Sequence, residues 1–263
     1  MNVGLLGSGH IARALSAGWS RQVIAASRRP RLLFFDIAPE TAAEAAGGCG
    51  GTVVATATGL VSASDVVVLA VRPPDVHGAL ASVRDTLGRR PLVSLAAGVV
   101  LADLLAALPA GARVGRLMPN VAAAVGAGVF LLADGSLGAS LRTVRSLFAE
   151  IGEVVEIDES SFDAATAISG CGPGFVALFM EALESAGVAA GLEPAAARAL
   201  CAGAFAGTAE LVRSGRAPAA VREAICSPGG MTAAGIRSLE RAGVGDAIAA
   251  AVAAAVRQAG ELA

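Results

Sequence analysis

The sequence contains no lysine and no tyrosine, so all twenty of its basic residues are arginine. These absences exclude a Walker-type phosphate lysine, a Schiff-base lysine and the Tyr/Lys pair of short-chain dehydrogenases. Only two histidines are present: His10 lies in a glycine-rich loop and His77 follows two prolines, so neither is placed as a general base. Any reaction must therefore depend on a bound cofactor and on positioned hydrogen bonds.

The sequence has few cysteines and no long run of residues with the same charge. The four cysteines, Cys49, Cys171, Cys201 and Cys226, show no CxxC spacing and no neighbouring histidine cluster. This pattern predicts free thiols in a reducing compartment, with neither disulfides nor a metal site. The formal net charge is only -2, which gives no electrostatic attraction to nucleic acid or to an anionic membrane. A small molecule is the expected partner.

Uninterrupted hydrophobic runs are short. The longest, residues 247–256, has ten residues, whereas a bilayer-spanning helix needs about 20. We expect it to form a packed helix. Met1 leads directly into an apolar run and a glycine loop without a basic region, so we expect no signal peptide. These features predict a soluble cytoplasmic protein with no membrane association.

Short apolar runs of strand length alternate with helical patterns in the first part of the chain. The expected strands are residues 2–6, 32–35, 65–71, 91–96, 113–117 and 129–132, with helices at 11–19 and 74–87. This alternation predicts an α/β domain with a doubly wound, mostly parallel sheet over residues 1–159. From about Ser160 the strand-like runs disappear, which predicts an all-helical second domain over residues 160–263.

A glycine loop follows the first expected strand. Gly7, Gly9 and Ala12 match the G-x-G-x-x-A fingerprint of Rossmann domains: Gly7 permits the tight turn, Gly9 lets the backbone approach a pyrophosphate, and Ala12 allows close helix packing. The pyrophosphate would lie at the positive end of the next helix. This motif predicts a nicotinamide dinucleotide site. The candidate binding residues here are Gly7, Ser8, Gly9, His10 and Ile11.

Asp36 ends the second expected strand. A carboxylate at this point accepts hydrogen bonds from both ribose hydroxyls of NAD and repels the 2'-phosphate of NADP. Arg28, Arg29 and Arg31 are close in sequence and could fold over a 2'-phosphate instead. The sequence favours NAD(H) and leaves NADP(H) open.

Several further segments carry a family resemblance. They are the glycine loop, residues 68–73 (VLAVRP), 94–98 (SLAAG), 116–120 (RLMPN), 163–173 (DAATAISGCGP) and 227–232 (SPGGMT). In this order and spacing the chain resembles the pyrroline-5-carboxylate reductase family along essentially its whole length. The resemblance implies reduction of the cyclic imine 1-pyrroline-5-carboxylate to L-proline by NAD(P)H, and an all-α dimerisation domain behind the Rossmann domain.

The resemblance also implies residue roles. The nicotinamide end of the cofactor would be lined by Ala70, Val71, Arg72, Pro73, Ala96, Ala97 and Asn120. The substrate would be bound by Glu159, Ser227, Gly229, Gly230, Met231 and Thr232. The loop at 227–232 opens a helix, so its backbone amides can cradle a small carboxylate. Thr232 matches the family threonine whose hydroxyl reaches the ring nitrogen, whereas Glu159 could equally be a solvated surface charge.

The chemistry suits a chain that lacks lysine. Reduction of an imine needs a hydride at carbon and a proton on nitrogen, and a protonated iminium requires no strong acid from the protein. Catalysis then depends on placing C4 of the nicotinamide over the imine carbon.

The chain departs from the usual family pattern at several positions. Val121 and Ala122 replace Thr-Pro, Cys171 replaces a serine, and Phe175 replaces a tyrosine. Two alternatives therefore stay open: a reductase of a related imine such as a six-membered piperideine carboxylate, and a non-catalytic nucleotide-binding paralogue. The helices after Phe175 are richer in apolar residues than a monomer could cover, which predicts a homodimer or a larger homo-oligomer.

Overall fold

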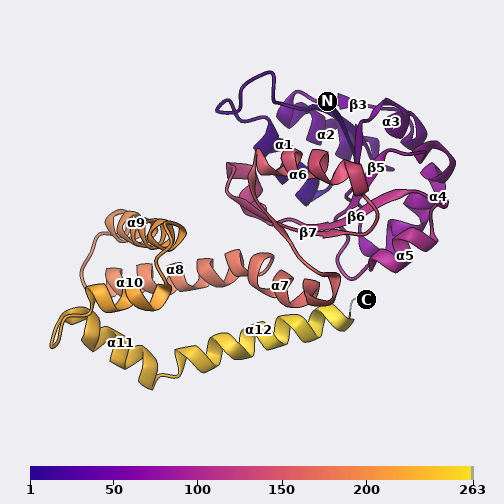
Figure 1. Cartoon of the computed structure of the whole chain (residues 1–263). Coiled ribbons are helices and arrows are strands. Elements are labelled where there is room, and N and C mark those ends of the chain that lie inside the picture. Colours follow the sequence, from indigo (N-terminus) through magenta and orange to yellow (C-terminus); the bar gives the residue numbers. More distant parts are fainter. Residues whose placement is uncertain (262–263) are drawn as a thin grey trace. The chain divides into compact units, whose positions relative to one another are not determined.

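The computed structural model describes residues 1–261 (Figure 1). The chain forms two compact units: residues 1–173 together with the end of the last helix from Ala255, and residues 174–254. Each unit is described in turn.

The first unit contains an eight-stranded sheet. The strands are β1 (Asn2–Leu6), β2 (Arg31–Phe35), β3 (Thr52–Val53), β4 (Val66–Leu69), β5 (Pro91–Ser94), β6 (Arg113–Met118), β7 (Gly128–Asp134) and β8 (Gly152–Glu156). Their order is β3-β2-β1-β4-β5-β6-β7-β8, and every neighbouring pair is parallel except β6 with β7. The order reverses between β1 and β4, as in a Rossmann fold. The predicted fold is confirmed.

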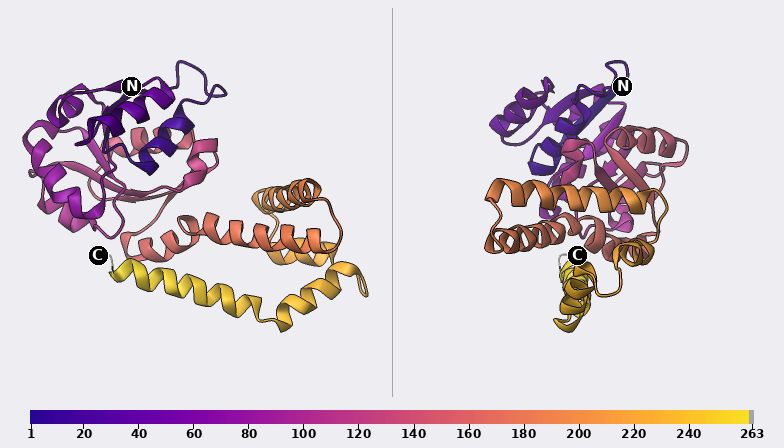
Figure 2. Two further views of the ribbon diagram at one scale, coloured as in Figure 1. Left: turned by 180° about the vertical axis from the view of Figure 1, so that it is seen from behind. Right: turned by 90° about the vertical axis from the view of Figure 1, so that its left-hand side faces the viewer.

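Helices cover both faces of this sheet (Figures 1 and 2). One face packs against α1 (His10–Trp19), α2 (Pro39–Cys49) and α6 (Leu141–Ala149), and the other against α3 (Ala57–Ala63), α4 (Val76–Leu87) and α5 (Leu101–Ala106). The central strands β4 and β5 are buried along their whole length, which explains why they are almost entirely apolar. Short 3-10 helices connect several elements: η1 (Pro73–Asp75), η2 (Val121–Val125), η3 (Gly138–Ser140) and η4 (Glu159–Ser161).

An aromatic cluster anchors α1 and α6. The Phe148 ring lies 5.3 Å from Trp19 and 5.1 Å from Phe130, measured between ring centroids. The buried indole nitrogen of Trp19 donates a hydrogen bond to the Leu147 carbonyl at 2.9 Å. This cluster fixes the start of the chain against β7 and α6.

The predicted boundary at residue 159 marks the change from strands to helices, since the last strand ends at Glu156. The compact units divide later, after Pro173. The reason is α7 (Phe162–Ser169), which packs on the sheet and buries Phe162 completely in the core cluster that α4 and α5 also contact.

The second unit is entirely helical over its described residues, as predicted. Its helices are α8 (Gly172–Ala189), α9 (Pro194–Arg213), α10 (Pro218–Ile225), α11 (Met231–Arg241) and α12 (Val244–Glu261), of which α8 begins and α12 ends in the first unit. Pro194 and Pro218 stand at the first positions of their helices, where a missing amide hydrogen costs nothing. Arg198 on α9 binds both carboxylate oxygens of Glu184 on α8, at 3.0 to 3.3 Å. This hydrogen-bonded ion pair raises the pKa of Arg198.

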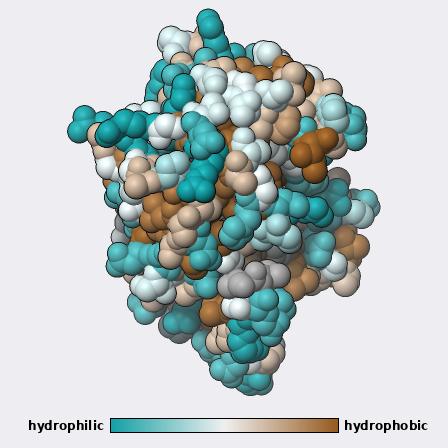
Figure 3. Space-filling model, turned by 90° about the vertical axis from the view of Figure 1, so that its right-hand side faces the viewer, coloured by the Kyte–Doolittle hydropathy of each residue, from teal (hydrophilic) through white to brown (hydrophobic). Residues whose placement is uncertain are grey.

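The second unit leaves many apolar side chains exposed. These include Leu178, Phe179, Leu183, Leu192, Leu200, Ile225 and Leu239. Two helical stretches, Glu159–Ala189 and Pro194–Arg213, are long and apolar enough to cross a membrane by length and composition alone, and only 6% and 11% of their apolar windows are buried. The sequence prediction considered uninterrupted runs only and therefore missed these interrupted ones. On the face drawn in Figure 3, by contrast, polar side chains divide the apolar surface.

Candidate active site

The predicted cofactor residues of the first unit gather at one edge of the sheet. Gly7 follows β1, Asp36 follows β2, Ala70 follows β4, and Asn120 lies just beyond β6. The strand ladder continues past the strand ends, because the Ala70 amide donates to the Leu6 carbonyl at 2.8 Å. The carboxyl ends of parallel strands are where Rossmann domains bind their ligands. The structure thus brings these residues to the expected edge.

At this edge the backbone of Gly7 lies very close to the backbone that follows β4. Its φ angle is +97°, and a Cβ atom there would lie 2.7 Å from the Ala70 carbonyl and 2.8 Å from the Val71 nitrogen. No larger residue fits this position without moving the backbone. The Gly7 amide also donates to the Phe35 carbonyl at 2.9 Å, which joins the loop to β2.

Gly9 leaves the N-terminus of α1 open. It is the N-cap residue, its φ of -71° suits any amino acid, and an added Cβ would meet no described atom within 4 Å. No side chain caps this helix within the described part of the chain. The first-turn amides can therefore donate to an anion, and the open space above Gly9 fits a pyrophosphate. Ser8 is buried, Ile11 is half-buried, and His10 is exposed.

Asp36 ties the glycine loop to the end of β2. One carboxylate oxygen accepts the Ser8 amide hydrogen at 2.8 Å, and the other accepts that of Ala38 at 3.0 Å. A carboxylate offers about four acceptor positions. Asp36 can therefore hold the loop and still accept ribose hydroxyls.

Arg28, Arg29 and Arg31, at and before the start of β2, lie at the opposite edge of the sheet. Arg31 begins β2 whereas Asp36 follows its end, a separation of about 16 Å at about 3.3 Å per residue. Arg28 pairs with Glu150, and Arg29 donates to the carbonyls of its own loop. The suggestion that these arginines fold over a 2'-phosphate beside Asp36 is therefore wrong, because the strand separates them from it.

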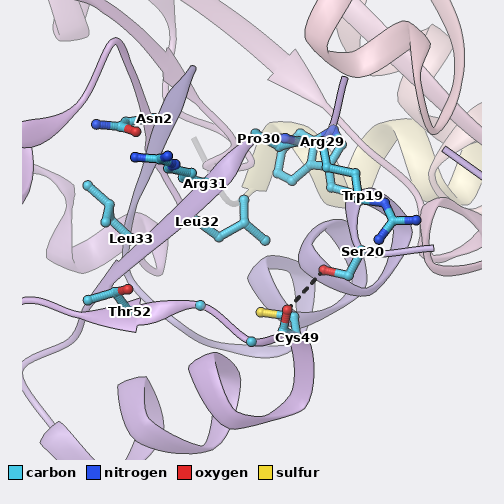
Figure 4. A pocket seen from close by; sticks show the side chains of 12 residues that line it. Asn2, Trp19, Ser20, Arg29, Pro30, Arg31, Leu32, Leu33, Cys49 and Thr52 are labelled. Atoms are coloured by element: carbon cyan, nitrogen blue, oxygen red, sulfur yellow. Dashed lines mark hydrogen bonds between the residues drawn. The ribbon is translucent and has the colours of Figure 1, made fainter. Parts of the chain in front are cut away.

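Figure 4 shows the surroundings of Arg29 and Arg31. They line a cavity of about 440 Å³ with Trp19, Cys49 and the first residues of β2. This cavity is a feature of the amino edge and is not the predicted cofactor site.

The remaining nicotinamide candidates take ordinary positions after their strands. Arg72 is exposed, and its Nε donates to Asp75 at 2.9 Å. Ala96 is buried, and its amide donates to the Ser94 hydroxyl at 3.3 Å. Val71, Pro73 and Ala97 are half-buried. Their contacts with a cofactor stay a prediction.

The side-chain amide of Asn120 is hydrogen-bonded to other residues of the protein. The residue is 6% exposed; its Nδ2 donates to the Ser169 carbonyl at 2.9 Å, and its Oδ1 accepts the Val129 amide hydrogen at 3.3 Å. Its side chain thus joins β6, β7 and the end of α7.

The loop of the second unit has the geometry of an anion cradle. The Gly230 amide donates to the Ser227 carbonyl at 3.0 Å across a turn with Pro228 second and Gly229, at φ +75°, third. This is the arrangement of a type II turn. Gly230 then forms the N-cap of α11 without a side-chain cap, so the first amides of this helix can bind a carboxylate. Met231 is 94% exposed and Thr232 is half-buried.

Glu159 is half-buried and paired. One oxygen accepts the Leu101 amide hydrogen at 2.7 Å and lies 3.4 Å from Nη1 of Arg116. Sequence reasoning quoted Arg116 within the 116–120 motif but assigned it no role. The signal available was a charged residue in the middle of a strand whose neighbouring positions are apolar.

An open glycine loop on a Rossmann sheet, joined to an all-helical unit, defines a dinucleotide-binding oxidoreductase with a separate helical domain. Two family models match accordingly: "NADP oxidoreductase coenzyme F420-dependent" over residues 2–98 and "Pyrroline-5-carboxylate reductase dimerisation" over residues 159–262. The chain belongs to the pyrroline-5-carboxylate reductase family, so the resemblance is confirmed.

Comparisons with individual relatives support the same family assignment. The chain is 37% identical to the pyrroline-5-carboxylate reductase of Mycobacterium leprae, with 96% of this chain and 94% of the relative covered. It is 34% identical to that of Pisum sativum, with 99% and 95% covered. The solved Plasmodium falciparum pyrroline carboxylate reductase with NADP bound is 28% identical, with a TM-score of 0.86 over 100% of this chain and 98% of that one.

Alanine substitutions at the two loop glycines should have different effects, one on NADH affinity and the other on stability. Gly9→Ala should leave the melting temperature unchanged, because φ is ordinary and the Cβ is unobstructed, yet weaken NADH binding at least tenfold by filling the space above the amides. Gly7→Ala should lower the melting temperature, because its Cβ would meet the backbone of Ala70. Calorimetric titration with NADH and thermal unfolding measure the two effects.

Gly78→Ala serves as the control. Gly78 lies on α4, and an added Cβ there also meets nothing within 4 Å, so NADH affinity should not change. Wild-type affinity in the Gly9 variant would show that the diphosphate does not lie over this glycine.

Proposed function

We propose that this protein reduces 1-pyrroline-5-carboxylate to L-proline with hydride from a nicotinamide dinucleotide. The observation that carries the proposal is a pair of glycine turns, at Gly7–Gly9 and Gly229–Gly230, each opening a helix whose first amides are uncapped. One turn suits the diphosphate of the cofactor and the other the carboxylate of the substrate. The family of the chain supplies the identity of the imine.

A dihydronicotinamide held at this site would supply the hydride for the carbon of the C=N bond. The backbone amides after Gly9 would hold the diphosphate, and Asp36 would hold the ribose. The amides after Gly230 hold the substrate carboxylate, and the protonated ring nitrogen donates a hydrogen bond to the Thr232 hydroxyl. The iminium brings its own proton, so the products are the amino acid and the oxidised nucleotide. Rate enhancement comes from orientation.

Thr232→Ala should lower kcat for 1-pyrroline-5-carboxylate by about 100-fold, the order of effect that a lost positioning contact can have. Thr232→Ser keeps a hydroxyl and should recover most of the rate. The measurement is NADH oxidation with saturating imine. An unchanged rate in Thr232→Ala would remove this residue from the site.

The same assay decides between the remaining activities. Faster turnover of a six-membered piperideine carboxylate than of the five-membered imine would favour the related reductase. No oxidation of NADH or NADPH with either imine would favour a non-catalytic paralogue.

We further propose that NADH is preferred over NADPH. Asp36 places a carboxylate at the expected ribose position, and the exposed Ile37 follows it. The arginines before β2 lie at the other edge of the sheet. Since a relative carries NADP, the proposed preference rests on this chain's own residues.

Asp36→Ser should raise kcat/KM with NADPH and lower it with NADH, because the repulsion of a 2'-phosphate disappears together with an acceptor for the ribose hydroxyls. We expect the ratio of the two values to change at least tenfold. Glu40→Gln is the control, since it removes an exposed charge on α2 and should change the ratio much less. An unaltered ratio in Asp36→Ser would refute the assignment of Asp36.

We propose that the protein works in the cytoplasm as a homodimer or larger homo-oligomer, without membrane or nucleic-acid partners. The dimerisation model covers the helices whose apolar side chains are exposed, and a second copy would cover them. Glu184 and Arg198 form an ion pair on these helices, and charged groups are costly inside a bilayer. All four cysteines are free thiols, which suits a reducing compartment.

Leu178→Glu should shift the protein toward monomer. Leu178 on α8 is 65% exposed in a single chain, so a second copy would have to desolvate the new carboxylate. Ala81→Glu on the exposed side of α4 is the control and should leave the assembly intact. Light scattering at micromolar concentration measures both, and a monomeric wild-type protein would contradict the proposed assembly.

A further inference from the structure

Two side chains of residues 116–120 bind helix α7, one near its start and one at its end. Arg116 on β6 holds the start of the helix, and Asn120, just beyond β6, holds its end. Both side chains therefore belong to one segment of five residues. Figure 1 shows α7 beside the sheet that it packs on.

Arg116 is a buried cation. Its side chain is 4% exposed; Nη1 lies 3.4 Å from Glu159 and Nη2 lies 3.8 Å from Asp163. The guanidinium carbon lies 4.2 Å from the centre of the Phe162 ring, an attractive cation–π arrangement. Its Nε has no hydrogen-bond partner among the described residues. A buried charge with an unpaired donor is costly, so an apolar residue here would serve packing alone at least as well.

Glu159 extends this contact to a third segment. The oxygen that faces Arg116 also accepts the Leu101 amide hydrogen at the start of α5. The guanidinium therefore joins β6, the first turn of α5 and the start of α7.

The other end of α7 lies at the carboxyl edge of the sheet. There Asn120 donates to the Ser169 carbonyl at 2.9 Å, and the amides of Gly170 and Cys171 bond back to Thr166. The turn from Ser169 to Gly172 thus lies at the edge where the glycine loop also lies. Its position depends on how α7 is held along its length.

We propose that Arg116 is a positioning residue for imine reduction: by holding the start of α7 through Glu159 and Asp163, it fixes the Ser169–Gly172 turn at the carboxyl edge of the sheet. The inference rests on the proposed function. The effect is on orientation and not on nucleotide affinity, because the glycine loop is held separately by β1, β2 and β4. Displacements of about 1 Å at a reacting centre can cost about 100-fold in rate.

The test uses Arg116→Met, Arg116→Lys and Asp163→Asn in the full-length protein. We expect kcat with 1-pyrroline-5-carboxylate to fall at least tenfold in Arg116→Met and less in the other two, while the Kd for NADH changes less than twofold. Lysine keeps the charge but cannot reach both carboxylates as a planar fork does. Asp163 is 46% exposed, so its variant should fold even if the Arg116 variants do not.

Hydrogen exchange provides a readout that does not depend on activity. The amides of α7 should exchange at least tenfold faster in Arg116→Met, whereas those of α4 should not change. Arg145→Met is the matched control, because Arg145 pairs with Glu156 at 3.2 Å on the surface and should alter neither kcat nor exchange in α7.

Three results would overturn the inference. They are unchanged exchange in α7, faster exchange with unchanged kcat, and a loss of NADH affinity as large as the loss of kcat. A wild-type protein that reduces no imine would instead refute the proposed function, and the exchange data would then still report whether Arg116 holds α7.

Discussion

The proposed nucleotide site depends on the close approach of Gly7 to the backbone at the end of β4. β1 lies between β2 and β4, where the order of the sheet reverses, and such reversals leave a crevice at the carboxyl ends of the strands. The chain can turn across this crevice only because Gly7 lacks a Cβ that would meet Ala70 and Val71. That turn directs the N-terminus of α1 toward the ligand edge, and the Asp36 carboxylate then holds the loop from the other side.

A site built on such turns explains how an oxidoreductase can lack lysine. Both proposed ligands are anionic, and in each case the donors are backbone amides at a helix N-terminus, which carries a partial charge of about +0.5. The backbone cannot distinguish one anion from another. In the proposed mechanism selectivity therefore rests on a few side chains, Asp36 for the ribose and Thr232 for the ring nitrogen.

The strands that the sequence predicted are those whose residues are apolar because both faces are buried. β1 has the predicted bounds, and β4 and β5 differ only at their ends, where the chain bends into the site. β3 has two exposed residues, and β8 carries glutamates on a partly exposed edge strand, so neither has the apolar pattern of a buried strand. The junction at Arg116 could not be predicted, because it depends on three segments that meet only in the fold.

Motif residues need not touch a ligand in order to serve a site. Family resemblance implied that Asn120 lines the cofactor, yet both polar atoms of its side chain are bonded within the protein, to Ser169 and Val129. A cofactor that took either bond would release α7 or β7 from the end of β6. Each of these two atoms keeps one further hydrogen-bonding position, so the side chain joins three elements of the fold while its contact with a nicotinamide stays a prediction. The same logic applies to Arg116, whose charge is met by two carboxylates of the chain itself.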